Sequence, residues 1–210
     1  MGKQNLDDIR FVTPNLLSYG SDDGFKPNLV MLEKMLFAVK KTKSVKRVFA
    51  GSFPSEIRPE QITKKALLII KKYCSNDNII IGAQSGSDQM LKLMHRGHTV
   101  DDVLRAINLA KEVGFKANVD FIFGMPGEKP EDEKATMKFM KKIVKTPGVR
   151  IHSHTFLPLA GTPWAGEKSG RISPELRQFL EELRRDGKEF GDWKEQEVFA
   201  QKLPKVFSNS

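Results

Sequence analysis

The stretch IIIGAQSGSDQMLKLMHRG, residues 79–97, decides the fold, because an apolar run gives way at once to an amphipathic helix across a short polar turn. Its first three residues are β-branched and continuous, which is typical of a strand buried on both faces of a parallel sheet. Ser87 is a natural N-cap for the helix, and Gly97 is expected to close it. The stretch predicts a βα unit with Gln84 and Ser85 at the carboxyl end of the strand, where parallel α/β folds bind ligands.

Strand-like and helix-like segments alternate along the chain, as judged from apolar residues at spacings of two and of three to four. Strands are expected at 10–14, 46–50, 79–81, 116–123 and 149–157, and helices at 27–41, 59–73, 101–113, 130–145 and 172–190. A loose tail is expected over 192–210, in which Trp193, Phe199 and Phe207 are candidates for docking. The pattern predicts an α/β fold, a partial (β/α) TIM-like barrel over residues 1–166, followed by a C-terminal helix and tail over 167–210.

Composition limits the classes of protein that fit. The 210 residues carry 35 Lys+Arg against 26 Asp+Glu, a net charge of +9. That balance fits contact with nucleic acid, attraction of anionic small ligands, or the charged surface of a thermophile. No apolar run long enough for a membrane span and no apolar N-terminal segment are present, so no membrane partner and no secretion are expected. The single cysteine excludes an internal disulfide and fits a reducing cytosol, so a cytoplasmic location is expected.

Asp120 is the most informative charge in the sequence. Alternation along its strand separates it from the apolar face, where every second residue from Ala117 to Phe123 is expected to pack. A carboxylate in such a strand is costly to bury unless it is paired, and a hydroxylated ligand in a barrel interior would satisfy it. Arg96, near a helix end, fits either an anionic ligand group or interaction with the helix dipole.

Other reactive side chains give weaker signals. His152 and His154 lie two residues apart on one strand face, but two ligands are too few for zinc, so we expect polar positions lining the barrel and no metal site. Cys74, at a helix end, is expected to be a packing residue. Glu56 and Glu128 are candidates for acid–base chemistry only by position, which argues against an ordinary TIM-barrel lyase or hydrolase.

Several motifs, in order, carry a resemblance to a known family. The chain reads QSGSD from Gln84, LKLMHRG up to Gly97, and DFIFGMPGE from Asp120 to Glu128. From about residue 11 to residue 166 it resembles the radical S-adenosylmethionine (SAM) superfamily, and most closely its methylthiotransferases and related archaeal Fe–S enzymes. The resemblance implies a SAM-binding barrel in an enzyme whose [4Fe–4S] cluster cleaves SAM reductively to a 5′-deoxyadenosyl radical, which abstracts hydrogen from a substrate.

The resemblance also implies which residues hold SAM. Gln84 and Asp120 are expected to bind the ribose hydroxyls and Arg96 the methionine carboxylate. Ser85 is expected to support this set, and Asn15 to lie near the methionine end of SAM.

Adenine is expected to lie between two loops at the strand ends. The backbone of Gly124 and Met125 would border it on one side, and the backbone of Leu157 and Pro158 on the other. Glycine and proline in such loops permit a close approach of the backbone to a flat ligand.

The chain departs from the family in two places. It lacks the CxxxCxxC loop that holds the cluster, and Cys74 stands elsewhere. We therefore expect the cluster-bearing first strand, and the cluster ligands, upstream of Met1 in a longer parent, unless the chain is a degenerate copy. A C-terminal helix also replaces the small β-barrel that binds RNA in methylthiotransferases, so both RNA and protein stay open as substrates.

Two further expectations follow. A missing strand leaves an unpaired sheet edge, which predicts homo-oligomers or aggregation. The rival to a radical SAM enzyme fragment is a non-catalytic, barrel-derived binding module associated with RNA through its basic surface.

Overall fold

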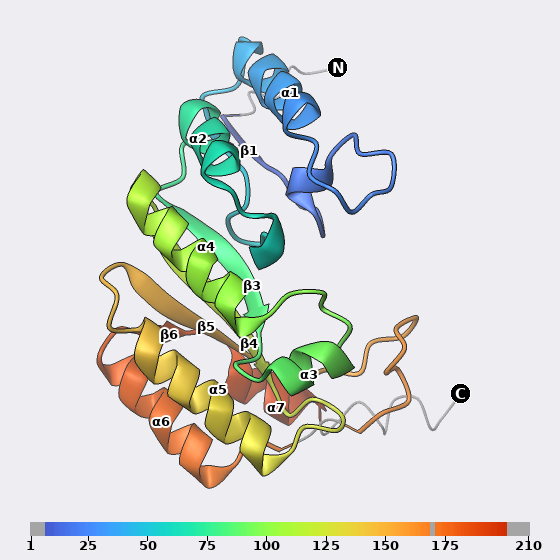
Figure 1. Cartoon of the computed structure of the whole chain (residues 1–210), viewed down its shortest axis with the longest axis vertical. Helices are drawn as coiled ribbons and strands as arrows, with labels where there is room; N and C mark the ends of the chain where they lie inside the picture. The colour runs from blue at the N-terminus through green and yellow to red at the C-terminus, as the bar shows by residue number, and fades with distance from the viewer. Residues whose placement is uncertain (1–6, 169–170, 201–210) are drawn as a thin grey trace. The chain divides into compact units, whose positions relative to one another are not determined.

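The structure is a computed structural model that describes residues 7–168 and 171–200, in which helices and strands alternate (Figure 1). The chain forms two compact units: Met1–Gly82 with Asp101–Asn118, and Ala83–Val100 with Val119–Ser210. Parallel pairing of β1 with β2 and of β5 with β6 confirms the predicted α/β class. No helix within the described residues has both the length and the apolar content needed to cross a membrane.

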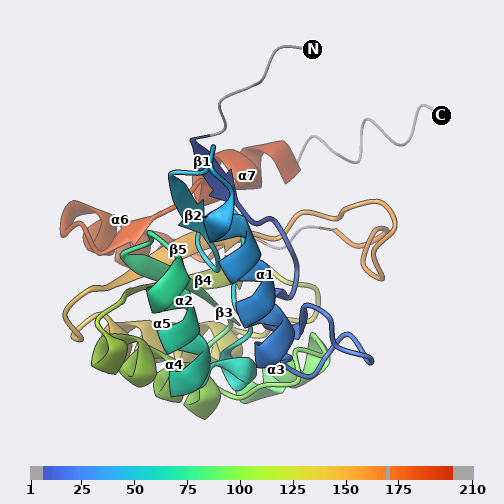
Figure 2. The ribbon, with the colours of Figure 1, turned by 90° about the horizontal axis from the view of Figure 1, so that it is seen from above.

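The first unit is built on a short parallel pair of strands. Ile9 on β1 lies opposite Val48 on β2, and helices α1 and α2 pack side by side (Figure 2). Its elements are β1 (Asp8–Arg10), the 3-10 helix η1 (Leu16–Ser18), α1 (Leu29–Lys41), β2 (Arg47–Phe49), the 3-10 helix η2 (Pro59–Gln61), α2 (Lys64–Tyr73) and α4 (Val100–Val113).

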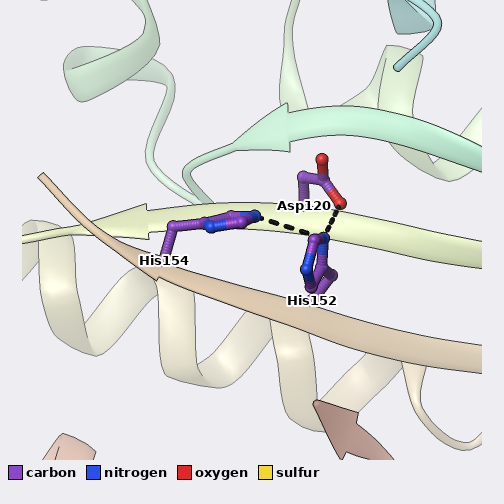
Figure 3. Close-up of side chains that lie close together, drawn as sticks. All are labelled: Asp120, His152 and His154. Atoms are coloured by element: carbon purple, nitrogen blue, oxygen red, sulfur yellow. Dashed lines mark hydrogen bonds and ion pairs between the residues drawn. The ribbon is translucent and has the colours of Figure 1, made fainter. Parts of the chain in front are cut away.

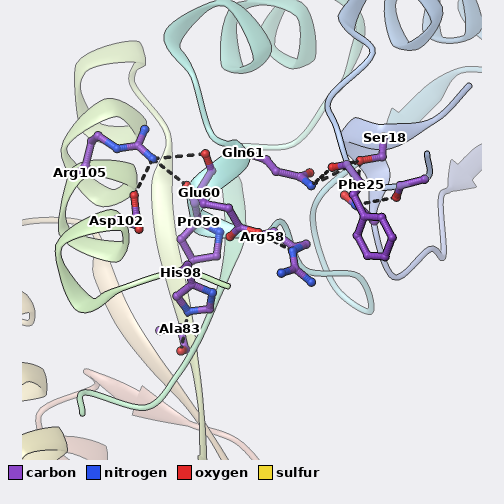
Figure 4. A network of polar contacts seen from close by, with 12 residues as sticks. Ser18, Phe25, Arg58, Pro59, Glu60, Gln61, Ala83, His98, Asp102 and Arg105 are labelled. Atoms are coloured by element: carbon purple, nitrogen blue, oxygen red, sulfur yellow. Dashed lines mark hydrogen bonds and ion pairs between the residues drawn. The ribbon is translucent and has the colours of Figure 1, made fainter. Parts of the chain in front are cut away.

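The helix expected over 59–73 is interrupted, which corrects the prediction. Thr63 has extended backbone angles, and its side chain accepts a hydrogen bond from the backbone N–H of Ala66, so α2 begins after it. Arg105 donates to the carbonyl oxygens of Ile62, at 2.7 Å, and of Pro59, at 3.3 Å (Figure 4). These bonds satisfy carbonyls that a continuous helix would have used, so Arg105 stabilises the interruption between η2 and α2.

The second unit contains the end of the central strand and most of the sheet. Its strands lie in the order β3-β4-β5-β6, and β3 and β4 each begin in the first unit and end in the second. Helix α5 packs against α6, and α6 against β6. The elements are β3 (Asn78–Gln84), α3 (Asp88–Leu93), β4 (Lys116–Phe123), α5 (Pro130–Ile143), β5 (Val149–Thr155), α6 (Pro174–Arg185), β6 (Glu189–Phe190) and α7 (Trp193–Ala200).

The C-terminal region differs from the prediction. The helix expected over 172–190 ends at Arg185, and after Gly187, at φ +68°, the chain forms a sixth strand parallel to β5. The buried Glu189 carboxylate accepts a hydrogen bond from Arg184 at 2.6 Å. Because this strand buries an ion-paired residue, it lacks the apolar pattern by which a strand is predicted. The expected loose tail is helical over α7.

Of the residues proposed to dock from this tail, the structure describes two. Trp193 is fully buried, as predicted. Phe199 is exposed, so the prediction that it docks was wrong. Phe207 lies outside the described residues.

Candidate functional site

The turn between β3 and α3 is fixed by contacts with α5. Thr136 Oγ1 accepts a hydrogen bond from the Gly86 N–H at 2.9 Å and lies 3.2 Å from Ser85 Oγ. A Cβ on Gly86 would lie 2.6 Å from Thr136 Cα and 2.9 Å from Phe139 Cβ, so only glycine fits this approach. Ser87 caps α3 as predicted, by accepting from the Met90 N–H at 3.3 Å. Ser85 therefore supports the turn, with its hydroxyl directed to α5.

Gln84 and Arg96 lie at the two ends of this turn–helix segment. Gln84 is buried with a positive φ of 67°, a conformation that costs a non-glycine residue about 1 kcal/mol or more. Helix α3 ends at Leu93, earlier than the predicted end at Gly97, because His95 already has a φ of 52°. The Arg96 N–H then bonds to the Leu91 carbonyl at 3.0 Å, which fixes the half-buried Arg96 beside the helix end.

The loop after β4 is organised by one carboxylate. Glu128 Oε2 accepts hydrogen bonds from the N–H groups of Gly124, at 2.7 Å, and of Met125, at 3.2 Å, while the Glu128 N–H bonds to the Met125 carbonyl at 3.0 Å. Burial raises the pKa of Glu128 to about 7, and the two backbone hydrogen bonds only partly oppose that rise. Both polar backbone groups of Met125, and the N–H of Gly124, are therefore engaged within the loop.

Asp120 has a partner within the chain. Its Oδ1 lies 2.9 Å from Nδ1 of His152, which in turn lies 3.1 Å from Nε2 of His154 (Figure 3). Asp120 is 9% exposed and His152 is 7% exposed. The cost of burying the carboxylate is therefore met by an imidazole on the neighbouring strand, and not only by the ligand that the sequence suggested.

The C-terminal elements surround the two histidines. The Phe190 ring stacks on His152, with centroids 4.5 Å apart and planes at 14°. Gln196 Oε1 accepts from the Thr155 N–H at 2.8 Å, and Gln196 Nε2 lies 3.2 Å from Nδ1 of His154. Strand β6 and helix α7 thus position side chains of β5.

The last part of the site is an apolar cluster next to the loops. Met90, Met125 and Phe156 are buried together, and Trp164 meets Phe156 edge to face at 5.9 Å. The Phe156 N–H bonds to the carbonyl of Phe123 at 2.9 Å, which brings the ends of β4 and β5 together.

The two loops expected to border adenine thus follow neighbouring strand ends. Gly124 and Met125 continue from β4, and Leu157 and Pro158 from β5, and of these four only Leu157 is not fully buried.

Asn15 belongs to the first unit. Its Nδ2 donates to Ser18 Oγ at 2.8 Å and to the Gly24 carbonyl at 3.3 Å. Asn15 Oδ1 is a buried acceptor without a hydrogen-bond partner among the described residues. The other eight predicted SAM-contacting residues lie in the second unit.

Sequence reasoning missed the roles of Thr136 and Glu128, and the pairing of Asp120 with His152. Helical periodicity places Thr136 toward the core but does not show which turn it meets. Glu128 was noted only by position, although a carboxylate four residues after a glycine could have suggested a loop cap. The Asp120–His152 pair needs the order of the strands, which no local pattern supplies.

The residues present fit SAM by their chemistry. In the second unit, a carboxylate and an amide suit ribose hydroxyls, and a guanidinium suits a carboxylate. They do not fit an iron–sulfur cluster, which needs several thiolates. The 210 residues hold one cysteine, and burial raises the pKa of the Cys74 thiol to about 12.

Curated relatives include tRNA-modifying enzymes. The uncharacterised protein MJ1620 of Methanocaldococcus jannaschii is 32% identical over 163 residues, which cover 75% of this chain and 32% of that protein. A tRNA-2-methylthio-N(6)-dimethylallyladenosine synthase of Buchnera aphidicola is 30% identical over 147 residues (68% and 33%). The threonylcarbamoyladenosine tRNA methylthiotransferase MtaB of Thermotoga maritima is 28% identical over 177 residues (83% and 38%). The chain spans about a third of the length of these relatives.

Solved structures with a similar fold are radical SAM enzymes. Coproporphyrinogen III oxidase (HemN) of Escherichia coli has a TM-score of 0.57 at 19% identity, over 76% of this chain and 38% of that one. The methyltransferase TsrM of Kitasatospora setae, with cobalamin and a [4Fe-4S] cluster bound, has a TM-score of 0.52 at 15% identity. The match covers 72% of this chain and 28% of TsrM. These two likenesses concern the fold. Residues 7–140 match the radical SAM superfamily itself, and the chain belongs to that superfamily.

Proposed function

We propose that this chain supplies the SAM-binding part of a radical SAM enzyme, with the cluster held by residues outside these 210. The observation that carries the proposal is the convergence of the family's motifs on neighbouring strand ends of one unit. Gln84 is the last residue of β3, Gly124 follows β4 and Leu157 lies just after β5, and these three strands are adjacent in the sheet. When bound, SAM supplies the adenosyl group on which the family's radical chemistry depends.

The proposed SAM-binding residues contact different parts of SAM. Arg96 binds the methionine carboxylate, and Gln84 binds a ribose hydroxyl from its strained turn. Asp120, which directs Oδ1 to His152, is proposed to bind the ribose hydroxyls through its carboxylate. The Gly124 carbonyl and Pro158 border adenine, and the apolar cluster around Phe156 excludes water from it.

Binding of SAM to the purified chain, measured by equilibrium dialysis, tests this function. A hydrogen-bonded charge pair contributes about 1.5–3 kcal/mol, so Arg96→Ala is expected to weaken binding by about 10-fold or more. Lys92→Ala removes an exposed positive charge from the same helix and is the matched control, with affinity expected to stay unchanged. Failure of the parent chain to bind SAM, or equal affinity in the two variants, would refute the assignment.

We propose RNA as the substrate class of the longer enzyme. The net charge of +9 favours contact with phosphates, and two relatives are named as tRNA-modifying enzymes. Retention of tRNA by the chain, falling steeply between 50 and 200 mM salt by roughly 10-fold or more, is expected. Retention of tRNA by a chain that binds no SAM would instead favour the rival, a non-catalytic RNA-associated module, which the single cysteine also suits.

A further inference from the structure

Three potential metal ligands meet in the second unit. Asp120 comes from β4, and His152 and His154 come from β5. One ligand atom from each side chain lies within 4.8 Å of the other two. The sequence supplied only the two histidines, and the structure adds the third ligand from the neighbouring strand (Figure 3).

Asp120, His152 and His154 place a carboxylate oxygen and two ring nitrogens next to one another. His152 Nδ1 offers either one proton or one lone pair, yet it meets Asp120 Oδ1 at 2.9 Å and His154 Nε2 at 3.1 Å. If it accepts from His154, it directs a lone pair at an ionised carboxylate. If it donates to Asp120, then Nε2 of His154 must be the unprotonated nitrogen of that ring.

The second arrangement fails at the other side of His154. A proton on Nδ1 would face Nε2 of Gln196, 3.2 Å away, which is itself a donor. The Gln196 amide is oriented by Oε1, which accepts from the Thr155 N–H at 2.8 Å. In this orientation of the Gln196 amide the contact at His154 Nδ1 is therefore unfavourable, and His154 can carry its proton there only if the amide turns.

We propose that Asp120, His152 and His154 form a binding site for a divalent transition-metal ion. A cation accepts a lone pair from all three atoms at once. Two imidazoles and one carboxylate are the protein ligands of several zinc enzymes and of non-haem iron sites, which keep further positions open. Metal–ligand bonds of about 2.0–2.1 Å place tetrahedral ligand atoms about 3.3 Å apart, so the contacts of 2.9 and 3.1 Å need to open by a few tenths of an ångström. The third pair of ligand atoms lies within 4.8 Å.

The surroundings are those of a supported metal site. Stacking of Phe190 holds the His152 ring in its plane, with the ring centroids 4.5 Å apart. Coordination through Nε2 leaves a proton on Nδ1 of His154, and a turn of the Gln196 amide would present Oε1 to it. Such outer partners fix the ring and raise its basicity as a ligand.

This site shares Asp120 with the proposed SAM site, and its two histidines are not among the proposed SAM contacts. Loss of metal binding with SAM binding retained, or the reverse, would tell the two proposals apart.

Titration of the metal-free chain with Co²⁺, followed by its visible absorption, and with Zn²⁺ in competition tests the site. One equivalent is expected to bind. His152→Ala and His154→Ala are each expected to weaken binding by more than about 100-fold, beyond the 10–100-fold effect of outer partners. His95→Ala, which removes an exposed histidine outside the group, is the matched control and is expected to bind as the parent does.

A gain-of-affinity variant keeps the test decisive even if the alanine variants unfold. Gln196→Glu retains all three ligands and offers carboxylate oxygens to both the Thr155 N–H and the His154 Nδ1 proton. It is expected to tighten Co²⁺ binding by about 10-fold. Absence of stoichiometric binding by the parent, or unchanged affinity in Gln196→Glu, would overturn the proposal.

Discussion

The β3–α3 turn (residues 84–87) and the β4–α5 loop (residues 124–128) stand at neighbouring strand ends but are held by different forces. The turn is fixed by the close approach of Gly86 to Thr136 and by hydroxyl groups, one of which, on Ser87, donates to the buried Asp132 carboxylate. The loop depends on the single carboxyl group of Glu128, whose pKa is raised to about 7. One side of the proposed SAM site is thus sterically fixed, and the other responds to protons.

The largest effect is expected where the turn is sterically closed. Gly86→Ala places a Cβ 2.6 Å from the backbone of Thr136, so α5 must shift, at a cost of about 3 kcal/mol, the upper end of the range for overpacking. Gly166→Ala is the control, because nothing lies within 4 Å of its Cβ and its cost should be below about 0.5 kcal/mol. Urea unfolding of both variants measures the difference. Equal stability would show that α5 does not press on the turn.

The loop should be distinguished by its pH dependence. Because the folded pKa of Glu128 is raised from 4.5 to about 7, the folded chain holds this proton more tightly than the unfolded chain. Its stabilising contribution is complete below pH 4.5 and falls as pH rises to 7, by about 2 kcal/mol between pH 5 and 7. Glu128→Gln should remove that part of the pH dependence of the free energy of unfolding.

The quantity to compare is the difference in the free energy of unfolding between the parent and Glu128→Gln at each pH, because groups common to both variants cancel. Buffers at pH 5, 6, 7 and 8 suffice. A difference that does not vary with pH would mean that the carboxyl group of Glu128 titrates alike in the folded and unfolded chain.

A smaller effect, independent of pH, is expected at Thr136. Thr136→Val leaves the Gly86 N–H without its acceptor and Ser85 Oγ without its neighbour, in a buried site, at a cost of roughly 1–2 kcal/mol. Thr136→Ser keeps the hydroxyl group and should restore most of the loss. If the valine variant, which keeps the methyl group, is as stable as the parent while the serine variant is not, methyl packing and not the hydrogen bonds holds the turn.

Local sequence patterns predicted the helices and strands that have a clear apolar spacing or a capping residue of their own. Strand β4 was predicted with its observed bounds, since apolar and polar residues alternate over 116–123, and Ser87 was recognised as the cap of α3. Strand β6 was missed because its two residues include Glu189, which is buried only through its pairing with Arg184.

The candidate site was predicted as a set of strand-end residues but not as a network. Asp120 was singled out correctly as a carboxylate in need of a partner. That the partner is His152, 32 positions along the chain, depends on which strands are neighbours, and strand order is a property of the whole sheet. Thr136 was missed for the same reason, because its contact with Gly86 spans 50 positions.

The position of Gln196 and Phe190 beside the two histidines has a practical consequence for anyone who shortens the gene. A protein ended after Arg185 would keep all the motifs by which the family is recognised, yet it would lose the ring that stacks on His152 and the amide next to His154. The family match over residues 7–140 would be unaffected by this truncation. The side of the sheet that β6 and α7 cover would nevertheless be exposed to solvent, and the two histidines would lack these neighbours.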